Sequence, residues 1–407
     1  NALFTSTSAV CVTGLTVVDT GRDFSLFGQI IILILIQLGG LGIMTFTTVI
    51  LISMGSRLSF QSRYGLSQSL DAGIRTHVNV LLKAVVITTL AVEGAGAILL
   101  FLRFHTQMPV GSAIYFSIFH AISAFCNAGF SLFSNSLEGF RSDIPVLLIF
   151  AFLIICGGLG FAVIREVYAR FVKKEPRLSL HSKLCLSTTA VLLVAGTIAI
   201  FVAEYHNSFK HTGLGYDIVN AFFQSTTSRT AGFNALRQTG LSNTTILITI
   251  ILMFIGACPG STGGGIKTTT VAVILHLVVD RFRGRRNVSI FKRTVSPDSI
   301  SRALTVLLLA LIAIVVIFAI FLFTEETPIG NRVSYGWFVE YLFEVFSAFG
   351  TVGLSMGVTS SLHNFGKVLI ILLMFAGRVG LLTLAFAMAR PKSKGEIVYR
   401  EEEVLVG

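Results

Sequence analysis

The sequence predicts an all-α integral membrane protein built from four similar repeats, each of helix, short re-entrant segment and helix, arranged around one axis. Three observations support this fold class. Of the 407 residues, 53% are hydrophobic and only 13% are charged, a balance typical of membrane proteins. Several uncharged apolar runs are long enough to cross a bilayer. One short pattern also recurs four times, and such a repeat indicates a repeated architecture.

The apolar runs are the candidate membrane helices. Residues 26–54 contain no charged residue, and neither do residues 146–164 and 303–323. Each run is close to or above the ~18–20 residues that a helix needs to cross a hydrocarbon core. Further candidates are 84–102, 184–203, 241–279 and 368–389.

The recurring pattern is an aromatic residue, three residues, a hydroxyl residue, five residues, a glycine and then Leu or Phe. Each instance lies in a segment too short to cross a bilayer, which predicts a re-entrant segment that ends in a turn. The four instances are Phe4, Ser8, Gly14 and Leu15; Phe119, Ser123, Gly129 and Phe130; Phe222, Thr226, Gly232 and Phe233; and Phe343, Ser347, Gly353 and Leu354.

These features divide the chain into four repeats and a tail. Repeat 1 holds only a re-entrant segment and a closing helix, so we expect its opening helix to lie upstream of Asn1. The predicted boundaries are 1–77, 78–177, 178–297 and 298–395 for the repeats, and 396–407 for the C-terminal tail.

The net charge of +11 does not indicate nucleic-acid binding, because the basic residues do not gather in one polar domain. Most lie in the loops after 26–54, 146–164 and 241–279 and in the tail, and the opposite loops hold far fewer. This alternation marks the basic side as cytoplasmic. We therefore expect a multi-pass plasma-membrane protein that contacts membrane lipid and has no nucleic-acid partner.

The repeated glycine has a chemical meaning in a membrane protein. An ion that enters a narrow pore exchanges its water for protein oxygens, and glycine allows backbone angles that turn carbonyl groups toward the axis. The residues before the four glycines are uncharged, which favours main-chain oxygens as ligands of a monovalent cation. We therefore predict a potassium filter made of Val12, Thr13, Gly14, Asn127, Ala128, Gly129, Thr230, Ala231, Gly232, Thr351, Val352 and Gly353.

Three polar residues lie close to the predicted filter in the sequence. We expect Arg229 and Glu344 to form structural ion pairs or hydrogen bonds behind the filter. We expect His120 to be a core histidine with its hydrogen bonds satisfied.

A second, glycine-rich repeat lies in the closing segments, at 39–42, 157–160, 264–267 and 377–380. Glycine clusters in membrane helices are typical of close helix packing. Lys267 and Arg378 depart from this pattern, since an ionised side chain within a span faces the protein interior or a watery cavity.

The third closing segment cannot remain helical from 256 to 265, because Pro259 removes a donor and five glycines favour unwound backbone. Irregular backbone at membrane depth is tolerated only inside protein or beside a water-filled cavity. We therefore predict a gate in the ion path. Arg378 has an alternative role, in which it only satisfies loop carbonyls. The predicted gate residues are Gly256, Gly260, Gly263, Gly264, Gly265, Lys267 and Arg378.

In these glycine turns, in the loop that ends Gly265-Ile266-Lys267 and at 377–380, the sequence resembles the Trk/Ktr/HKT superfamily of potassium transporters, most of all its Ktr-type membrane subunits. The resemblance covers the whole chain. It implies a fourfold pseudosymmetric pore, with K+ as the main ion because Gly14 is intact, and Na+-stimulated transport in some members. It also implies a homodimer and a KtrA-type cytosolic nucleotide-binding ring as regulator, and the acidic end at 401–407 resembles a tail at the dimer interface.

The sequence thus predicts potassium uptake through a four-loop filter, gated by the intramembrane loop and Arg378, with no organic cofactor. The alternative is an alternating-access secondary cation transporter, because such proteins also have repeats and broken helices. A membrane enzyme would need a cluster of catalytic His, Asp or Ser residues at membrane depth, and the sequence offers none.

Overall fold

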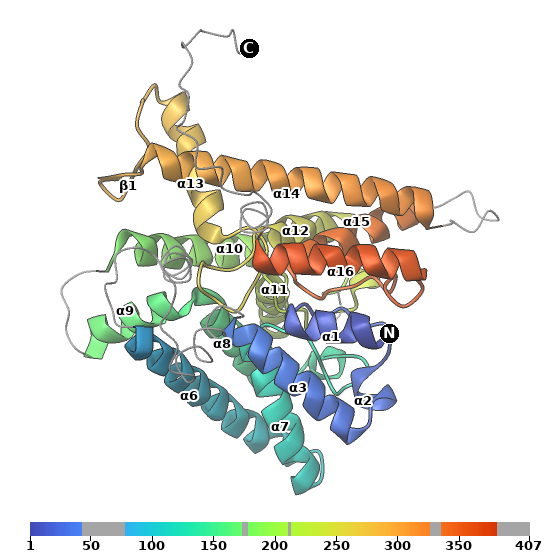
Figure 1. Ribbon diagram of the computed structural model, residues 1–407. Coiled ribbons are helices and arrows are strands. Elements are labelled where there is room, and N and C mark those ends of the chain that lie inside the picture. The colour runs from blue at the N-terminus through green and yellow to red at the C-terminus, as the bar shows by residue number, and fades with distance from the viewer. Residues whose placement is uncertain (43–77, 173–177, 211–212, 326–334, 381–407) are drawn as a thin grey trace, which may run out of the picture.

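The computed structural model describes residues 1–42, 78–172, 178–210, 213–325 and 335–380. Almost all of these residues that are not in turns are helical, and the helices fall into three classes that recur along the chain (Figure 1). The predicted tail at 396–407 lies outside the described residues.

Long helices form the first class: α6 (Val78–Phe104), α10 (Leu180–Glu204) and α14 (Pro297–Thr324). Among the described residues, three segments are long and apolar enough to cross a membrane as single helices, namely Val85–Phe104, Leu180–Glu204 and Pro297–Thr324. They confirm the helices predicted at 84–102, 184–203 and 303–323.

Short helices form the second class. They are α1 (Ala2–Val10), α7 (Val110–Phe125), α11 (Leu214–Thr227) and α15 (Tyr335–Gly350). Each ends a few residues before one of the four repeated glycines, and none is longer than 16 residues. The prediction of short segments that end in a glycine turn is confirmed.

The third class follows each glycine turn: α3 (Leu26–Leu41), α8 (Ile144–Leu159), α12 (Asn243–Phe254) and α16 (Asn364–Val379). Three of these helices begin at a capping side chain. Ser25 accepts from the amide of Gly28, Asp143 from that of Val146, and Ser242 from that of Thr245. Such caps satisfy amides that have no partner inside the helix.

The predicted closing helix at 146–164 is wrong as a single element. Helix α8 ends at Leu159, α9 (Phe161–Val172) begins at Phe161, and the two are bent by 102°. Gly160 between them has a φ of +89°, which ends the helix because this region favours glycine. Gly42 and Gly380 end α3 and α16 with φ of +84° and +86°, and the remainder of those predicted helices lies outside the described residues.

The helices pack in a cyclic order. Helix α3 contacts α7, α8 contacts α11, and α12 contacts α15. The cycle closes because α16, near the end of the described chain, packs against α1 at its start (Figure 1). Each helix of the third class thus supports the short helix that follows it in the cycle.

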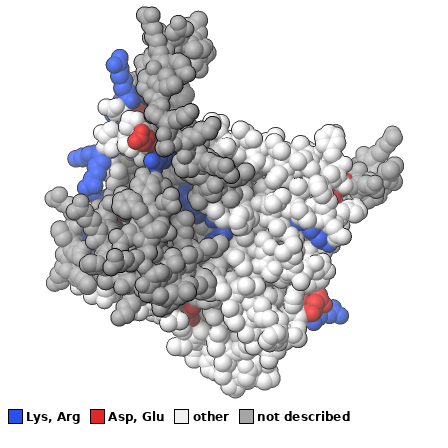
Figure 2. All heavy atoms as spheres, viewed as in Figure 1, with Lys and Arg blue, Asp and Glu red and all other residues white. Residues whose placement is uncertain are grey.

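The remaining described elements are small. They are α2 (Thr20–Asp23), η1 (Glu138–Phe140), η2 (Gln238–Gly240), α13 (Thr268–Phe282), and a hairpin of β1 (Ser289–Ile290) and β2 (Arg293–Thr294). Figure 2 shows that most of the visible described surface carries no charge, and that Lys and Arg gather at the end where Figure 1 places α13 and β1.

Candidate functional site

The four repeated glycines share one backbone conformation. Gly14, Gly129, Gly232 and Gly353 have φ between +70° and +95°. The residues two positions earlier carry side chains and still have φ between +49° and +76°, a conformation that L-residues rarely adopt. These residues are Val12, Asn127, Thr230 and Thr351. Four copies of the same strained turn in four separate segments point to a functional site.

The glycines contact one another in a closed cycle, here called the glycine ring. A Cβ atom on Gly14 would lie 3.0 Å from the Cα of Gly129, and one on Gly129 would lie 3.1 Å from that of Gly232. A Cβ on Gly232 would lie 3.1 Å from the Cα of Gly353, and one on Gly353 would lie 3.0 Å from that of Gly14. Only glycine permits this approach.

Main-chain oxygens lie at the same level as the glycine ring. Each added Cβ would come within 2.8 Å of the carbonyl oxygen that directly precedes the next glycine. These oxygens belong to Thr13, Ala128, Ala231 and Val352. All twelve predicted filter residues lie in the four turns, and they are buried or partly buried.

Side chains two positions before the ring pack against glycines of the closing segments. A Cβ on Gly39 would lie 2.9 Å from Val12 Cγ2, and one on Gly377 would lie 3.3 Å from Thr351 Cγ2. In the third repeat, Thr230 contacts Gly263 in the same way. These side chains are therefore directed toward the supporting helices and the loop.

The first glycine of each helical closing segment packs on the end of a short helix. A Cβ on Gly39 would lie 2.8 Å from the carbonyl carbon of Val10, the last residue of α1. Gly157 and Gly377 contact Phe125 and Phe349 in the same manner. The prediction of close packing is confirmed at these three glycines.

Hydroxyl groups at the ends of the short helices hold the turns. Ser8 Oγ accepts from the amide of Gly14 at 3.1 Å, and Ser347 Oγ accepts from that of Gly353 at 3.1 Å. Ser123 Oγ donates to the carbonyl of Phe130 at 2.7 Å. These three residues are the hydroxyl positions of the repeated pattern.

The third repeat differs by one residue. Thr226 fits the sequence pattern, but its hydroxyl donates to Phe222 in its own helix. Thr227 Oγ1 instead donates to the carbonyl of Phe233 at 2.9 Å, and its own carbonyl accepts from the amides of Ala231 and Gly232. The hydroxyl that holds this turn is therefore that of Thr227, the last residue of α11, and not that of Thr226 in the repeated pattern.

All three polar residues near the turns form the expected contacts. His120 is fully buried, with Nδ1 2.8 Å from the Phe116 carbonyl and Nε2 3.0 Å from Ser131 Oγ. Glu344 is fully buried and accepts hydrogen bonds from Ser355 and Thr359 in the turn that follows Gly353.

Arg229 donates to Thr189 Oγ1 at 3.5 Å. Within the described part of the chain it forms no ion pair with a carboxylate.

The predicted break in the third closing segment is confirmed. Helix α12 ends at Phe254 and α13 begins at Thr268. Between them the backbone is irregular, apart from an isolated bridge between Ile255 and Ile266. The amide of Gly256 donates to the Ile266 carbonyl at 2.8 Å, which closes the segment into a loop. We call residues 255–267 the intramembrane loop.

The intramembrane loop bonds to the C-terminal ends of two other closing helices. The amides of Cys258 and Thr262 donate to the carbonyls of Gly158 and Gly157 at 3.0 and 3.2 Å. Gly265 donates to the Gly377 carbonyl at 3.2 Å. The Gly260 carbonyl accepts from the amide of Phe161 at 3.3 Å, so α8, α9 and α16 all contact the loop.

Both predicted gate cations bind carbonyl oxygens of the loop. Lys267 Nζ donates to the Gly263 carbonyl at 2.7 Å. The Arg378 guanidinium donates to the Thr262 carbonyl and also to the Gly39 carbonyl in α3. Arg378 thus satisfies one loop carbonyl, which is compatible with both of its predicted roles, and its second acceptor in the first repeat adds a link across the molecule.

The loop also contacts the turns directly. Gly263 lies against Thr230, and Gly264 lies against Thr351 and the Gly377 carbonyl. The structure therefore brings all seven predicted gate residues into one cluster directly beside the twelve filter residues. The sequence patterns did not mark the Gly39 carbonyl as an acceptor for Arg378. They also did not mark the Thr227 hydroxyl, at the end of α11, as the group that holds the third turn.

Comparisons with known proteins identify relatives over the length of the chain. The family model described as TrkH, cation transport protein, matches residues 1–396. The chain is 40% identical over 410 residues to the Ktr system potassium uptake protein B of Bacillus subtilis, covering 100% of this chain and 89% of the relative. It is 37% identical over 410 residues to the potassium/sodium uptake protein NtpJ of Enterococcus hirae, with coverage of 100% and 89%.

A solved structure shows the same fold. The crystal structure of the potassium transporter TrkH from Vibrio parahaemolyticus aligns with a TM-score of 0.73 and 19% identity, covering 95% of this chain and 77% of that one. The family consists of multi-pass plasma-membrane transporters, not enzymes. A family match over nearly the whole chain, with full-length relatives at about 40% identity, establishes that this chain belongs to the TrkH family of cation transport proteins.

Proposed function

We propose that this protein takes up potassium through a pore whose filter is the glycine ring. The observation that carries the proposal is the closed cycle of contacts from Gly14 through Gly129 and Gly232 to Gly353. Four turns of one geometry, taken from four parts of the chain, meet at one place and set main-chain oxygens around it. A bare monovalent cation can exchange its hydration shell for such oxygens.

The surroundings of the ring favour a cation. Helices α1, α7, α11 and α15 end at the turns, so the negative ends of their dipoles face the ring. The filter turns themselves contain no carboxylate, which suits a monovalent cation better than a divalent one. The names of the relatives, which are potassium or potassium/sodium uptake proteins, support K+ as the transported ion and leave Na+ as a second candidate.

The intramembrane loop is the proposed gate. It lies directly beside the filter turns, and Arg378 and Lys267 hold its carbonyls in place. Both side chains are cations, so the closed loop presents positive charge to an approaching potassium ion. Transport then requires that the loop move away from the ring axis.

Regulation is proposed from the relatives and from charge. The Bacillus subtilis relative is named as a component of a Ktr system, which is consistent with a regulatory partner. We propose a homodimer controlled by a KtrA-type cytosolic nucleotide-binding ring. This cytosolic ring would act on the intramembrane loop through the basic segments near α13 and β1, where Lys and Arg gather (Figure 2).

Tracer uptake tests the transport proposal. Cells that lack their own potassium transporters and express this chain should accumulate rubidium, and a K+ excess should compete with the tracer. The purified chain in liposomes should give the same flux, and deleting residues 260–263 should raise it. Equal tracer content in cells with and without the chain would contradict potassium uptake, whereas unchanged flux after the deletion would contradict only the gate.

The alternating-access alternative makes a different prediction. It requires a site that is occluded from both sides in each cycle, so flux would saturate at a slow turnover and would not rise when the loop is shortened. The contacts among the four turns favour the pore.

A further inference from the structure

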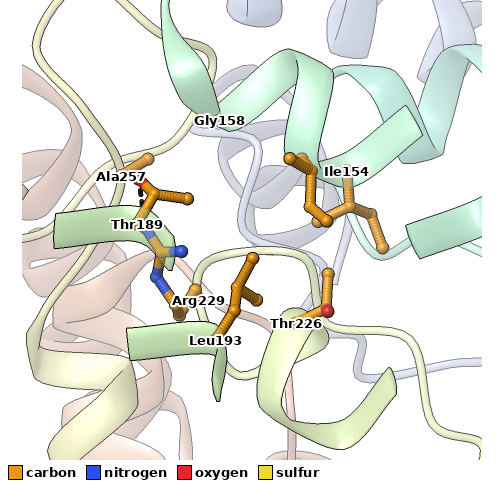
Figure 3. Close-up of a pocket in the computed structure, with 8 residues that line it drawn as sticks. Ile154, Gly158, Thr189, Leu193, Thr226, Arg229 and Ala257 are labelled. Atoms are coloured by element: carbon orange, nitrogen blue, oxygen red, sulfur yellow. Dashed lines mark hydrogen bonds between the residues drawn. The ribbon is translucent and has the colours of Figure 1, made fainter. Parts of the chain in front are cut away.

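Arg229 is a buried cation beside the filter without a carboxylate partner in the described part of the chain. Its side chain is only 7% exposed, Nη2 donates to Thr189 Oγ1 at 3.5 Å, and Nε has no partner. Figure 3 shows the guanidinium and Thr189 beside a small cavity, which Ile154, Leu193 and Ala257 also line. The cavity has room for about one water molecule.

An unpaired charge in such a place is costly. Removing an ion from water costs several kcal/mol unless an opposite charge or strong hydrogen bonds replace the solvent. One long hydrogen bond to a neutral hydroxyl and one water are weak compensation. The position therefore calls for a negative group close to Arg229.

Cys258 of the intramembrane loop is the group that fits. It is fully buried, and Thr189 Oγ1, the acceptor of Arg229, lies 3.5 Å from its Sγ. Thr268 Oγ1 donates to the same sulfur at 3.3 Å. With Arg229 donating to the Thr189 oxygen, the Thr189 proton is free to point at the sulfur, which then accepts from two hydroxyls.

If Cys258 were a protonated thiol, its S–H group would have only a distant carbonyl as hydrogen-bond acceptor. The carbonyl of Cys185 lies 4.0 Å away, at the limit for a sulfur hydrogen bond. Thr268 is the first residue of α13, so the sulfur also lies at the positive end of a helix of 15 residues. These are the surroundings that favour a thiolate.

The charged groups that face Cys258 are both positive among the described residues. Arg229 comes from the filter turn, and Lys267 comes from the end of the same loop. On α10, His181 Nε2 lies 3.6 Å from the sulfur of Cys185. This contact is therefore with Cys185 and not with Cys258. No carboxylate of the described chain forms an ion pair with either cation.

We propose that Cys258 is a thiolate paired with Arg229, and that it makes the intramembrane loop a modification site for thiol-directed electrophiles. The pair joins the loop to the filter turn of the third repeat through Thr189 of α10. The closed loop buries the sulfur completely. A reagent reaches it only when the loop moves, so the second half of this inference rests on the proposed gate.

The chemistry of modification is simple. With an alkyl methanethiosulfonate, the thiolate attacks the sulfenyl sulfur, a disulfide bond forms, and methanesulfinate leaves with the electron pair. The product is neutral at sulfur, so Arg229 loses its counter-charge. The modified loop can no longer return to its closed contacts, and flux rises.

Raman spectroscopy tests the charge state without any need for access. The described chain has five free cysteines. At pH 7, Cys258→Ser should leave the S–H stretching band of the purified full chain unchanged, because Cys258 carries no thiol proton. In the background of Arg229→Gln, the same substitution should lower the band by about one fifth, since five thiols are then protonated.

Cys156→Ser is the matched control, because Cys156 is a partly buried thiol on α8, outside the intramembrane loop, and its replacement should lower the band in both backgrounds. If Arg229→Gln does not fold, Thr189→Val replaces it, since it removes the link between the two groups. A loss of S–H intensity on Cys258→Ser in the native background would overturn the thiolate.

Labelling tests the modification site. In liposomes, 2-(trimethylammonium)ethyl methanethiosulfonate should modify Cys258 roughly tenfold faster when Arg378→Gln frees the loop, as read by peptide mass spectrometry. If Arg378→Gln raises flux but Cys258 is labelled no faster, the modification site is overturned while the gate stands. If Arg378→Gln leaves flux unchanged, the gate fails, and the Raman result alone decides the ion pair.

Discussion

The guanidinium of Arg378 donates a hydrogen bond to the main-chain carbonyl of Gly39, 339 residues earlier in the chain. A second bond from the same group reaches the Thr262 carbonyl in the intramembrane loop. One side chain therefore joins α16, α3 and the loop. Arg378 is a mechanical link as well as a charge near the proposed ion path.

Arg378→Lys separates these two roles. Lysine keeps the charge but lacks the planar fork that reaches two carbonyls at once. Losing one charge-assisted bond removes about 1.5–3 kcal/mol from the closed loop, which raises the open population by roughly tenfold or more. We expect rubidium flux through liposomes to rise with Arg378→Lys and to rise further with Arg378→Gln.

The opposite pattern is equally informative. Flux that rises with Arg378→Gln but stays at the native level with Arg378→Lys would mean that the charge alone forms the barrier. Lys367→Gln is the control, because Lys367 lies in α16 but forms no ion pair with any described residue.

Gly232→Ala should abolish potassium uptake. The residue has a φ of +79°, and its Cβ would lie 3.1 Å from the Cα of Gly353 and closer still to the Val352 carbonyl. The conformation alone costs an L-residue about 1–2 kcal/mol, and the collision forces the ring apart. Tracer uptake should fall by more than about tenfold at equal expression.

Gly139→Ala is the matched control, since no atom lies within 4 Å of its added Cβ and its φ is ordinary. Uptake that survives Gly232→Ala at the level of Gly139→Ala would exclude the ring as the filter.

Part of this architecture is readable from sequence because it depends on local composition. Apolar runs located α6, α10 and α14, and the spacing of hydroxyl and glycine located the four turns. Pro259 and its neighbouring glycines predicted the break between α12 and α13. Each of these features needs only the chemistry of a few consecutive residues.

The rest depends on contacts between distant segments. Gly157 and Gly160 are three residues apart in one glycine-rich stretch, yet the first packs on a short helix while the second ends α8 with a positive φ. Residue type does not distinguish these uses. The acceptors of Arg378 are carbonyls, which every residue has, so no sequence pattern marks Gly39 or Thr262.

Asp280 gives a prediction about pH outside the spans. A hydrogen bond from the amide of Ser289 at 3.0 Å, and then Arg285, lower the pKa of this carboxyl below its ordinary value of 3.8. Because the pKa is lower in the folded state, the ionised carboxylate stabilises the folded hairpin fully at pH values above the ordinary pKa of 3.8. This contribution is lost as the pH falls through the pKa of the folded state. Protection of the Ser289 amide from hydrogen exchange, corrected for intrinsic rates, should therefore decrease below about pH 4.

In Asp280→Asn the protection should be lower at pH 7 and should not change with pH. A pH response that persists in Asp280→Asn would assign it to another group.

The third repeat offers a comparison between adjacent residues of the same type. Thr226 occupies the hydroxyl position of the repeated pattern, yet Thr227 holds the turn through its bond to the Phe233 carbonyl. Both hydroxyls are buried, and valine matches threonine in shape, so each substitution removes a hydroxyl and little else.

Thr227→Val leaves the Phe233 carbonyl without that donor, at a cost of about 1–3 kcal/mol, and should lower both the thermal midpoint and the preference for K+ over Na+. Thr226→Val removes a bond within a helix whose carbonyl keeps its backbone partner, so both measurements should stay near the native values. If Thr226→Val were the more damaging of the two in competition uptake, the pattern would describe the turn better than the contacts do.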